Sequence, residues 1–501
     1  MNLQPAFDEF AQAYAAGRPQ VVWTRLIDDL ETPVSAYLKI AKGQPFAFLF
    51  ESVEGGAWRG RYSVVAMQPE LIWRCRGDKA EIAQGGDLSQ FTPQSGGALE
   101  SLRDLVAASR IALPDGLPPM SSGVFGVLGY DMVRLAERLP GVNPDPLDLP
   151  DAVMIRPSIV AVFDAIAQEI ILVTTVRPGA GDARAAFDAA RERLAKVQAD
   201  LKAPMPAAAE PQAQAAAVEF ETKVSRADYA KIVAKAKDYI LAGDIFQVVP
   251  SHRFSAPFHL PPFALYRSLR RTNPSPFLFY LNFGGFQLVG SSPEILVRLR
   301  DGKVTIRPIA GTRPRGATPH EDSALERELL ADPKERAEHL MLLDLGRNDV
   351  GRVAKIGSVK VTDQFFIERY SQVMHIVSNV EGDLADNRDA LDALAAGFPA
   401  GTVSGAPKVR AMQIIDELEK EKRGIYAGSV GYFSAAGDMD TCIVLRTALI
   451  KDGTMYVQAG AGIVADSNPA SEQQECINKA KALFRAADEA RRFASAAGRG
   501  Q

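Results

Sequence analysis

The chain has 501 residues, a formal net charge of −4 and 47% hydrophobic residues, which is enough for a large core in two domains or one composite domain. Its mildly acidic, mixed-charge composition gives no reason to expect a nucleic-acid partner. No apolar run approaches the roughly 20 residues that a membrane helix needs, and the N-terminus lacks a signal-peptide pattern, so we expect a cytoplasmic protein with no membrane partner. The three cysteines are widely spaced and predict neither a disulfide framework nor a zinc site.

The first 202 residues read as an N-terminal domain. Short strand-like runs separated by glycine and proline turns occur at 47–52, 70–75 and 170–176, and residues 182–202 form an amphipathic helix pattern. Residues 203–218, "APMPAAAEPQAQAAAV", are rich in alanine, proline and glutamine. We interpret them as a linker between this part and a C-terminal domain at 219–490, which is followed by a tail at 491–501.

The C-terminal part opens with a helix pattern that ends near Gly243. Two helices are expected at about 321–331 and 334–346, another at about 407–422, and a closing helix begins near 471. The strand candidates lie at 246–251, 277–283, 286–292, 294–300, 303–311, 371–382, 427–433, 442–450 and 454–464. Strand runs joined mostly by short turns, with helices inserted in pairs, predict an α+β fold. We expect a large, mainly antiparallel β-sandwich flanked by helices.

Two glycine patterns resemble nucleotide-binding loops but lack the required context. "FPAGTVSGAPK" (398–408) has its glycines one residue too close for a Walker A motif, and Val409 stands where a hydroxyl should be. "GAGIVA" (460–465) is followed by "DSNP", which is turn chemistry rather than the helix that a dinucleotide site needs. The first loop still leads into a helix N-terminus, which favours an anion such as a carboxylate or a phosphate.

Two pairs of glutamates lie three residues apart on predicted helices: Glu335 with Glu338, and Glu472 with Glu475. Residues at this spacing share a helix face, so each pair presents two carboxylates together. A solvated, salt-bridged surface is the ordinary explanation, and Lys479 stands one turn after Glu475. Oxygen ligands from two helices, without cysteine or histidine partners, suit Mg²⁺ as the alternative.

Several other polar residues interrupt apolar segments of the C-terminal part. His375 lies in an alternating strand, where it is either a buried core residue or an acid–base group. Arg446 interrupts "CIVLRTALI", so we expect it to meet either a structural carboxylate or an anionic ligand. Tyr426 is either a core residue or a hydroxyl donor. The turn at Gly311 and Thr312, in "PIAGTRPRG", offers backbone N–H groups and a hydroxyl.

Taken together, these segments resemble the chorismate-utilising enzymes, most closely the anthranilate synthase component I family. The matching blocks are "DIFQVVPS" (244–251), "PIAGTRPRG" (308–316), "EHLMLLDLGRNDVGR" (338–352), "VMHIVSNVEG" (373–382), "GTVSGAPKVRAMQIIDELE" (401–419), "RGIYAGSVGY" (423–432), "CIVLRT" (442–447), "VQAGAGIVADSNPASE" (457–472) and "NKAKAL" (478–483). "FLFESVEGG" and "GRYSVVA" in the N-terminal part are similar to the family's regulatory domain, which is expected to pack on the catalytic portion.

The resemblance implies a function and a role for each matching residue. A Mg²⁺ ion held by Glu338 and Glu475, with Glu335 and Glu472 in support, would bind the ring carboxylate of chorismate. Gly311, Thr312 and Thr402 would help to bind that carboxylate, and the enolpyruvyl carboxylate would be held by Tyr426, Arg446, Gly460, Ala461 and Gly462. His375 would be the general acid for departure of the C4 hydroxyl. Ammonia would add at C2, and loss of pyruvate would give anthranilate.

Two positions separate this chain from relatives with other products. Gln247 stands where isochorismate- and salicylate-forming members carry a lysine base, and Ala310 stands where many aminodeoxychorismate synthases carry a lysine. Aminodeoxychorismate synthase nevertheless stays open as an alternative, as does a non-catalytic subunit that senses tryptophan.

The resemblance also implies a partner and an effector. The chain shows no glutaminase signature, so ammonia is expected from a separate glutamine amidotransferase subunit. Tryptophan is expected to act as a feedback inhibitor at Glu51, Ser52, Pro276, Phe277 and Leu278 in "LFES" and "NPSPFLFY". Ordinary loop and edge-strand packing is the alternative explanation of these two segments.

Overall fold

The computed structural model describes residues 1–52, 60–141, 143–179, 181–206, 219–370 and 373–494. The α-helices are α1 (Phe7–Ala15), α2 (Pro33–Ala36), α3 (Ala98–Ala108), α4 (Ala183–Lys202), α5 (Arg226–Leu241), α6 (Pro262–Thr272), α7 (Pro319–Ala331), α8 (Pro333–Gly351), α9 (Ala390–Gly397), α10 (Gly401–Ser404), α11 (Lys408–Leu418) and α12 (Pro469–Glu489). No helix in these ranges combines the length and apolarity needed to cross a bilayer.

The strands before the predicted linker belong to the same sheet as most of those after it. They are β1 (Gln20–Ile27), β2 (Phe48–Glu51), β3 (Tyr62–Arg76), β4 (Lys79–Gln84), β5 (Thr92–Pro93), β6 (Gly123–Leu128), β7 (Ala152–Asp164) and β8 (Glu169–Val176). After the linker come β9 (Glu221–Thr222), β10 (Gln247–Val248), β11 (Ser251–Pro257), β12 (Phe277–Asn282), β13 (Gln287–Ser292), β14 (Ile295–Arg300), β15 (Lys303–Ile306), β16 (Ile309–Pro314), β17 (Lys360–Arg369), β18 (Val373–Asp383), β19 (Gly405–Ala406), β20 (Ser429–Ser434), β21 (Met439–Ile443), β22 (Thr447–Lys451) and β23 (Thr454–Gly460).

All strand pairings among the described residues are antiparallel. The paired strands β3 and β7 start two branches. The first branch runs from β3 through β2, β12, β13, β22, β23 and β11. The second branch runs from β7 through β6, β20, β21, β14, β15 and β18. The predicted α+β fold with a mainly antiparallel sheet is confirmed.

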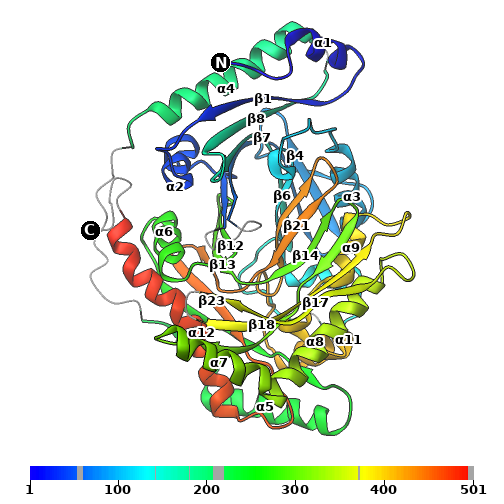
Figure 1. The fold of residues 1–501 in the computed structure, drawn as a ribbon, viewed down its shortest axis with the longest axis vertical. Coiled ribbons are helices and arrows are strands. Elements are labelled where there is room, and N and C mark those ends of the chain that lie inside the picture. The colour runs from blue at the N-terminus through cyan, green and yellow to red at the C-terminus, as the bar shows by residue number, and fades with distance from the viewer. Residues whose placement is uncertain (53–59, 142, 180, 207–218, 371–372, 495–501) are drawn as a thin grey trace.

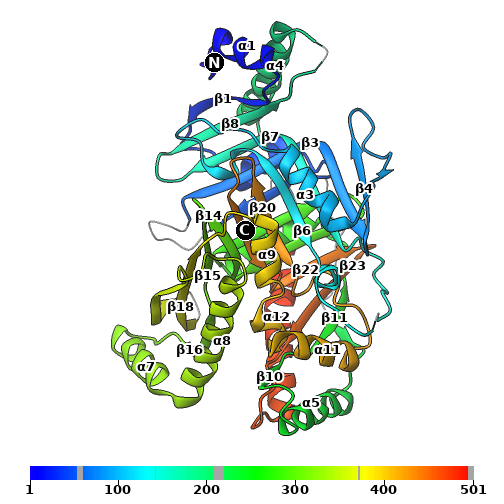
Figure 2. The ribbon, with the colours of Figure 1, turned by 90° about the vertical axis from the view of Figure 1, so that its right-hand side faces the viewer.

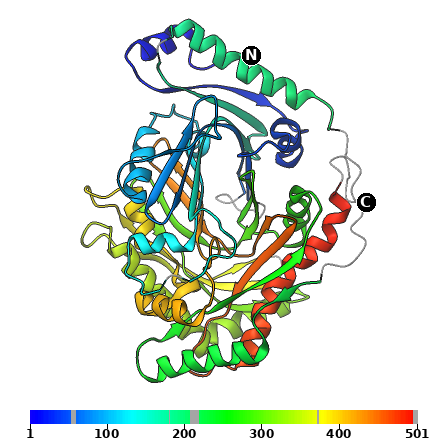
Figure 3. The same ribbon diagram turned by 180° about the vertical axis from the view of Figure 1, so that it is seen from behind.

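The helices flank this sheet at different places (Figure 1). At one end, α1 packs on α4, and at the opposite end lie α5 and α7 (Figures 1 and 2). The long helix α12, drawn in red, follows one flank of the molecule and packs on α5, α6 and β23 (Figure 3). Its inner face is apolar, with Cys476, Ala480, Leu483 and Phe484 buried in the same core as α5 and α6. Burial of this face explains why the C-terminal sequence forms a stable helix.

The chain crosses between the two branches at two points that matter for the site. Pro293 and Glu294 connect β13 of the first branch to β14 of the second, and residues 444–446 connect β21 back to β22. The sequence predicted a continuous strand over 442–450, and that prediction is wrong at Arg446. This residue has φ +47°, which is incompatible with an extended strand, so the chain between β21 and β22 leaves the sheet at this point. Such strained backbone persists where surrounding contacts impose it, often at functional sites.

The sheet is continuous across the predicted domain boundary. Strand β2 pairs with β12, and β6 pairs with β20, so each branch joins strands from before the linker to strands from after it. Residues 207–218 of the predicted linker and residues 495–501 of the predicted tail lie outside the described residues. The domain limits at 202 and 218 stay a prediction.

Candidate active site

A cavity of about 240 Å³ lies where the two crossovers, the strand ends and the helices α8, α10 and α12 meet. We call it the active cavity. Among its lining residues are ten that the sequence singled out: Gly311, Thr312, Glu338, His375, Thr402, Tyr426, Arg446, Gly460, Gly462 and Glu475. These residues span positions 311 to 475 of the chain. The fold therefore brings together side chains that are distant in the sequence.

Three predicted residues do not line the cavity. The Glu335 carboxylate accepts a hydrogen bond from Arg313 at 3.3 Å and lies beside Gly311, where an added Cβ would be 3.2 Å from it. Burial raises the pKa of Glu472, and the neighbouring Glu475 carboxylate raises it further. Ala461 is fully buried next to the lining residues Gly460 and Gly462. Glu335 and Ala461 therefore adjoin lining residues, and Glu472 lies on α12 three residues before the lining residue Glu475.

The carboxylates of Glu338 on α8 and Glu475 on α12 face the same cavity from opposite helices. Burial raises the pKa of Glu338, and the nearby carboxylates Glu335 and Glu475 contribute to the rise. Gln247 donates a hydrogen bond to Glu338 at 3.2 Å, and Lys479 forms an ion pair with Glu475 at 2.7 Å. The ion pair on α12 that the sequence suggested is therefore present, but Glu475 also reaches the cavity.

His375 lies on β18 opposite Thr312 of β16. Its Nδ1 is 2.9 Å from the Gly311 carbonyl oxygen and 3.1 Å from Thr312 Oγ1. A carbonyl only accepts hydrogen bonds, so Nδ1 carries the proton and a neutral ring leaves Nε2 as an acceptor. Burial lowers the pKa of His375 and favours this neutral form.

Gly311 makes the turn that the histidine needs. Its φ of +70° belongs to the left-handed region, and an added Cβ would come within 3.2 Å of Glu335, Leu329 and Ile376. Both facts favour glycine, because a side chain would be strained and crowded. The turn aims the Gly311 carbonyl at His375 and places Thr312 on the cavity wall.

Sequence reasoning missed Glu294, which lies on the first crossover. It is buried, lines the active cavity and accepts a hydrogen bond from Thr402 Oγ1 at 3.1 Å. Burial raises the pKa of Glu294 to about 8, although Thr402 and the charges of Arg446 and Lys479 oppose the rise. The signal was an acidic residue inside the apolar run "LVGSSPEILV", which is the same kind of interruption that drew attention to Arg446.

Arg446 and Tyr426 also line the active cavity. Arg446 lies close enough to Glu294 and His375 to influence the pKa of each. Tyr426 is buried and comes so close to Gly460 that an added Cβ there would be 3.0 Å from the phenol oxygen. A guanidinium, a phenol and the backbone of a glycine-rich strand end suit a bound carboxylate.

The turn at 401–405, which resembled a phosphate loop, forms the short helix α10 and then β19. Gly401 packs against Leu345 of α8, since an added Cβ would be 2.0 Å from its Cδ2 atom. Only Thr402 and Val403 of this turn line the cavity. The helix after it, α11, starts at Lys408 and is capped by no side chain. Gly401 therefore serves close packing between the turn and α8, and Gly405 serves close packing against Gln247 of β10.

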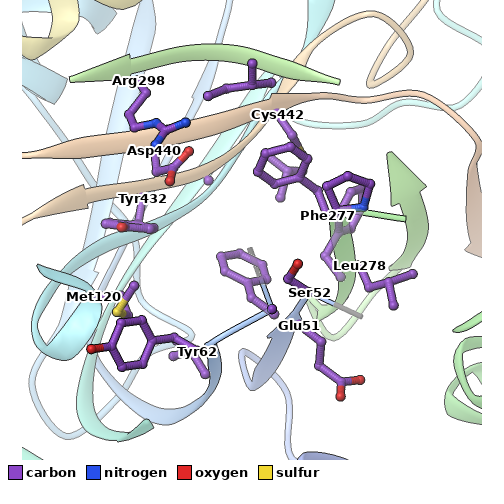
Figure 4. A pocket seen from close by; sticks show the side chains of 18 of the residues that line it. Glu51, Ser52, Tyr62, Met120, Phe277, Leu278, Arg298, Tyr432, Asp440 and Cys442 are labelled. Atoms are coloured by element: carbon purple, nitrogen blue, oxygen red, sulfur yellow. The ribbon is translucent and has the colours of Figure 1, made fainter. Parts of the chain in front are cut away.

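A second, larger cavity of about 580 Å³ lies nearer the N-terminal strands (Figure 4). All five residues predicted for effector binding line it: Glu51, Ser52, Pro276, Phe277 and Leu278. The Glu51 carboxylate accepts a hydrogen bond from Tyr266 and two from Arg270, the latter at 2.8 and 3.0 Å. It points away from the cavity centre. Ser52 Oγ is buried and has no hydrogen-bond partner among the described residues. The two cavities share Pro293 and Ile309 as lining residues.

Comparison with known proteins gives consistent results. Residues 47–485 match the family model of the chorismate binding enzyme. The anthranilate synthase component 1 of Cereibacter sphaeroides is 59% identical over 498 residues, covering 99% of this chain and 100% of that protein. The protein of the same name from Pseudomonas putida is 48% identical over 494 residues, covering 96% and 97% of the two chains.

Solved structures show the same fold. The crystal structure of anthranilate synthase component I from Streptococcus pneumoniae matches with a TM-score of 0.75 and 38% identity, over 92% of this chain and 99% of that chain. The menaquinone-specific isochorismate synthase of Escherichia coli matches with a TM-score of 0.69 over 96% and 98% of the chains. At 21% identity this second likeness concerns the fold alone.

Proposed function

The chain belongs to the chorismate-binding enzymes and, within them, groups with anthranilate synthase component 1; we propose that it converts chorismate and ammonia to anthranilate, pyruvate and water as the large subunit of an anthranilate synthase. The observation that carries this proposal is the active cavity itself. It combines two facing carboxylates, a carboxylate-binding guanidinium and phenol, a buried acid and an imidazole in one space.

The two carboxylates of the substrate are proposed to bind on opposite sides of this cavity. Arg446, Tyr426 and the Gly460 backbone would hold the enolpyruvyl carboxylate, because a planar guanidinium fork matches a carboxylate. The ring carboxylate would lie toward Thr402, Thr312 and the two glutamates. Anchoring both ends fixes the ring between them, so that C2 and C4 face the acid–base groups.

Mg²⁺ is the proposed cofactor, and the donor set fits it. Glu338 and Glu475, supported by Glu335 and Glu472, are hard oxygen donors, and Mg²⁺ typically takes one or two carboxylates and keeps positions for water and substrate oxygens. Burial, and to a smaller extent neighbouring carboxylates, raises the pKa of Glu338 and of Glu472, and a bound cation would favour their charged forms. Within the described ranges no group of three or more His, Cys, Asp or Glu side chains is arranged to hold a metal by itself. The bound ion would supply positive charge for the ring carboxylate.

We infer different proton-transfer roles for the two acid–base groups. With a pKa of about 8, Glu294 is mostly protonated at neutral pH and can donate its proton to the departing C4 hydroxyl. Neutral His375, with its Nδ1 proton held by Gly311, presents Nε2 as an acceptor. That arrangement suits removal of the C2 proton when pyruvate leaves and the ring becomes aromatic. The earlier assignment of His375 as general acid stays a prediction.

Ammonia is the proposed nucleophile, and a glutamine amidotransferase subunit is its proposed source. Gln247 carries no basic group to activate water, and its amide is hydrogen-bonded to Glu338. Ala310 on the cavity wall has no amine that could bond to the substrate ring. The name component 1 in the relatives implies a second component, which agrees with this source.

Tryptophan is the proposed inhibitor, and the larger cavity is its proposed site. The cavity is lined by apolar groups such as Phe277, Leu278 and Cys442, together with Ser52, whose buried hydroxyl needs a partner. An indole ring with one N–H donor suits such a lining. Because Glu51 is bound by Arg270, we expect its part in binding to be structural.

The decisive experiment is an assay with chorismate, Mg²⁺ and ammonium and no partner subunit. Fluorescent anthranilate and pyruvate in equal amounts are expected. An amino product that keeps its enolpyruvyl group would indicate aminodeoxychorismate synthase instead. No turnover at high ammonium, with tryptophan still bound, would indicate a sensing subunit without chemistry.

A further inference from the structure

We propose that Arg423, which does not line the active cavity, is a positioning residue for the carboxylate-binding side of the cavity, a role that rests on the proposed function. Arg423 lies between α11 and β20, and only 1% of its side chain is exposed. Its guanidinium joins three chain segments that each supply wall residues to the cavity. No pattern in the sequence singles it out.

The hydrogen bonds of Arg423 go to backbone carbonyls of two wall residues. Nη1 donates to the Val403 carbonyl at 2.7 Å, and Nη2 donates to the Val249 carbonyl at 2.6 Å. Val403 and Val249 both line the active cavity. A further bond, from Val249 N–H to the Ser404 carbonyl at 3.0 Å, ties the same two segments to each other. The guanidinium therefore fixes the distance between the turn at 401–405 and the strand region at 247–251.

The partner carboxylate, Glu419, extends this connection to a third wall segment. Arg423 binds Glu419 through Nε and Nη2, at 3.0 and 2.6 Å. Glu419 also accepts from Ser251 N–H at 2.7 Å and from Ser251 Oγ at 2.9 Å. Ser251 Oγ accepts in turn from Gln458, another wall residue, at 2.8 Å. This demand on Glu419 explains why α11 stops at Leu418 and not near 422 as the sequence predicted.

Arg423 also supports Tyr426 directly. Its guanidinium carbon lies 5.5 Å from the centroid of the Tyr426 ring and 4.8 Å from that of Tyr130 on the other side. The cation–π contacts hold the phenol of Tyr426 near Gly460, where the enolpyruvyl carboxylate is proposed to bind. The contacts with Tyr426 and, through Glu419 and Ser251, with Gln458 lead to the carboxylate-binding side.

The metal-binding side is held in another way. The hydrogen bonds of Arg423 reach neither α8, which carries Glu338, nor α12, which carries Glu475. One link is indirect, because Gln247 of the segment that Arg423 fixes donates to Glu338. A change at Arg423 should therefore disturb chorismate binding much more than Mg²⁺ binding. A general loosening of the fold would change both. Lysine keeps the charge but has no planar fork that reaches two carbonyls and a carboxylate at once.

The test is Arg423→Lys, assayed with saturating ammonium and compared with Arg134→Lys as matched control. Arg134 also joins α11, through Asp416 at 2.7 Å, and binds Asp131 and the Gly141 carbonyl, but it contacts no wall residue. For Arg423→Lys we expect the KM for chorismate to rise at least about tenfold, with a smaller fall in kcat. Mg²⁺ binding to the substrate-free protein, titrated by calorimetry with Mg²⁺ alone, should stay within about twofold of wild type. Arg134→Lys should leave KM unchanged.

Ser251→Ala provides a second variant if Arg423→Lys does not fold. It removes only the hydroxyl link between Glu419 and Gln458, and a rise in KM for chorismate at unchanged Mg²⁺ affinity is expected. An unchanged KM in the variant that folds overturns the proposal, and so does an equal loss of chorismate and Mg²⁺ binding. A wild type that forms no anthranilate refutes the proposed function instead, and chorismate binding measured by calorimetry still tests Arg423.

Discussion

Glu294 offers the sharpest test, because one substitution should change activity and stability in opposite directions. Burial raises its pKa from the ordinary 4.5 to about 8, so about 90% of the carboxyls are protonated at pH 7. The substitution Glu294→Gln keeps the shape and an oxygen that accepts from Thr402. It removes the proton that we assign to hydroxyl departure, and loss of a general acid lowers kcat by about 100- to 10,000-fold.

The effect on stability follows from proton linkage. The folded protein holds the Glu294 proton more tightly than the unfolded chain, so the wild type loses stability as pH rises from 4.5 toward 8. The accumulated cost is roughly 3 kcal/mol at pH 7 and roughly 5 kcal/mol above pH 8. The Glu294→Gln protein has no such ionisation. We therefore expect its advantage over wild type in free energy of unfolding to grow between pH 5 and pH 9.

The assay combines initial rates with urea unfolding at pH 5, 7 and 9. Asp349→Asn is a suitable contrast, because burial also raises the pKa of Asp349, yet this carboxylate is paired with Lys408 at 2.8 Å. Breaking that buried pair should destabilise the protein at pH 7, where Glu294→Gln stabilises it. A Glu294→Gln enzyme with a wild-type rate would refute the acid role. A stability difference that does not change with pH would refute the assigned ionisation.

Three further predictions concern other parts of the two cavities. Glu475→Gln should lower kcat/KM at least about 100-fold and weaken chorismate binding while the circular dichroism spectrum stays unchanged; wild-type activity at trace Mg²⁺ would contradict the metal assignment. His375→Ala should lower kcat by about 100-fold or more with a KM within about threefold of wild type, measured by anthranilate fluorescence, and an unchanged kcat would exclude His375 from proton transfer. Ser52→Leu should raise the tryptophan concentration for half-inhibition about tenfold without changing kcat, and full sensitivity to tryptophan would argue against the larger cavity as its site.

The sequence identified ten of the residues that line the active cavity, some because they break local patterns and others through the resemblance to a known family. Arg446 interrupts an apolar strand, and Glu338 precedes an apolar helix segment. Such interruptions are costly unless the polar group has a partner, so they reveal themselves without a structure. Glu294 has the same pattern, but it is the first residue of the strand expected over 294–300, where a charged residue is ordinary.

Other features depend on long-range pairing and could not be predicted from local patterns. The positive φ of Arg446 results from the change of branch between β21 and β22, which no local propensity encodes. The role inferred for Arg423 rests on carbonyls at positions 249 and 403, and carbonyls carry no sequence signal. Helices were easier to predict because their periodicity is local. The predicted helix over 182–202 corresponds to α4 at Ala183–Lys202.

The branched sheet has a consequence for the order in which the chain is synthesised. Strand β6 emerges from the ribosome early, but its neighbour β20 begins about 300 residues later, which takes roughly 15–60 s at the usual rates of translation. During that interval one edge of β6 has no native neighbour, and exposed edges invite wrong pairing. That edge of β6 therefore stays open in the nascent protein until β20 arrives, and Glu475 on α12, a proposed Mg²⁺ ligand, is synthesised later still.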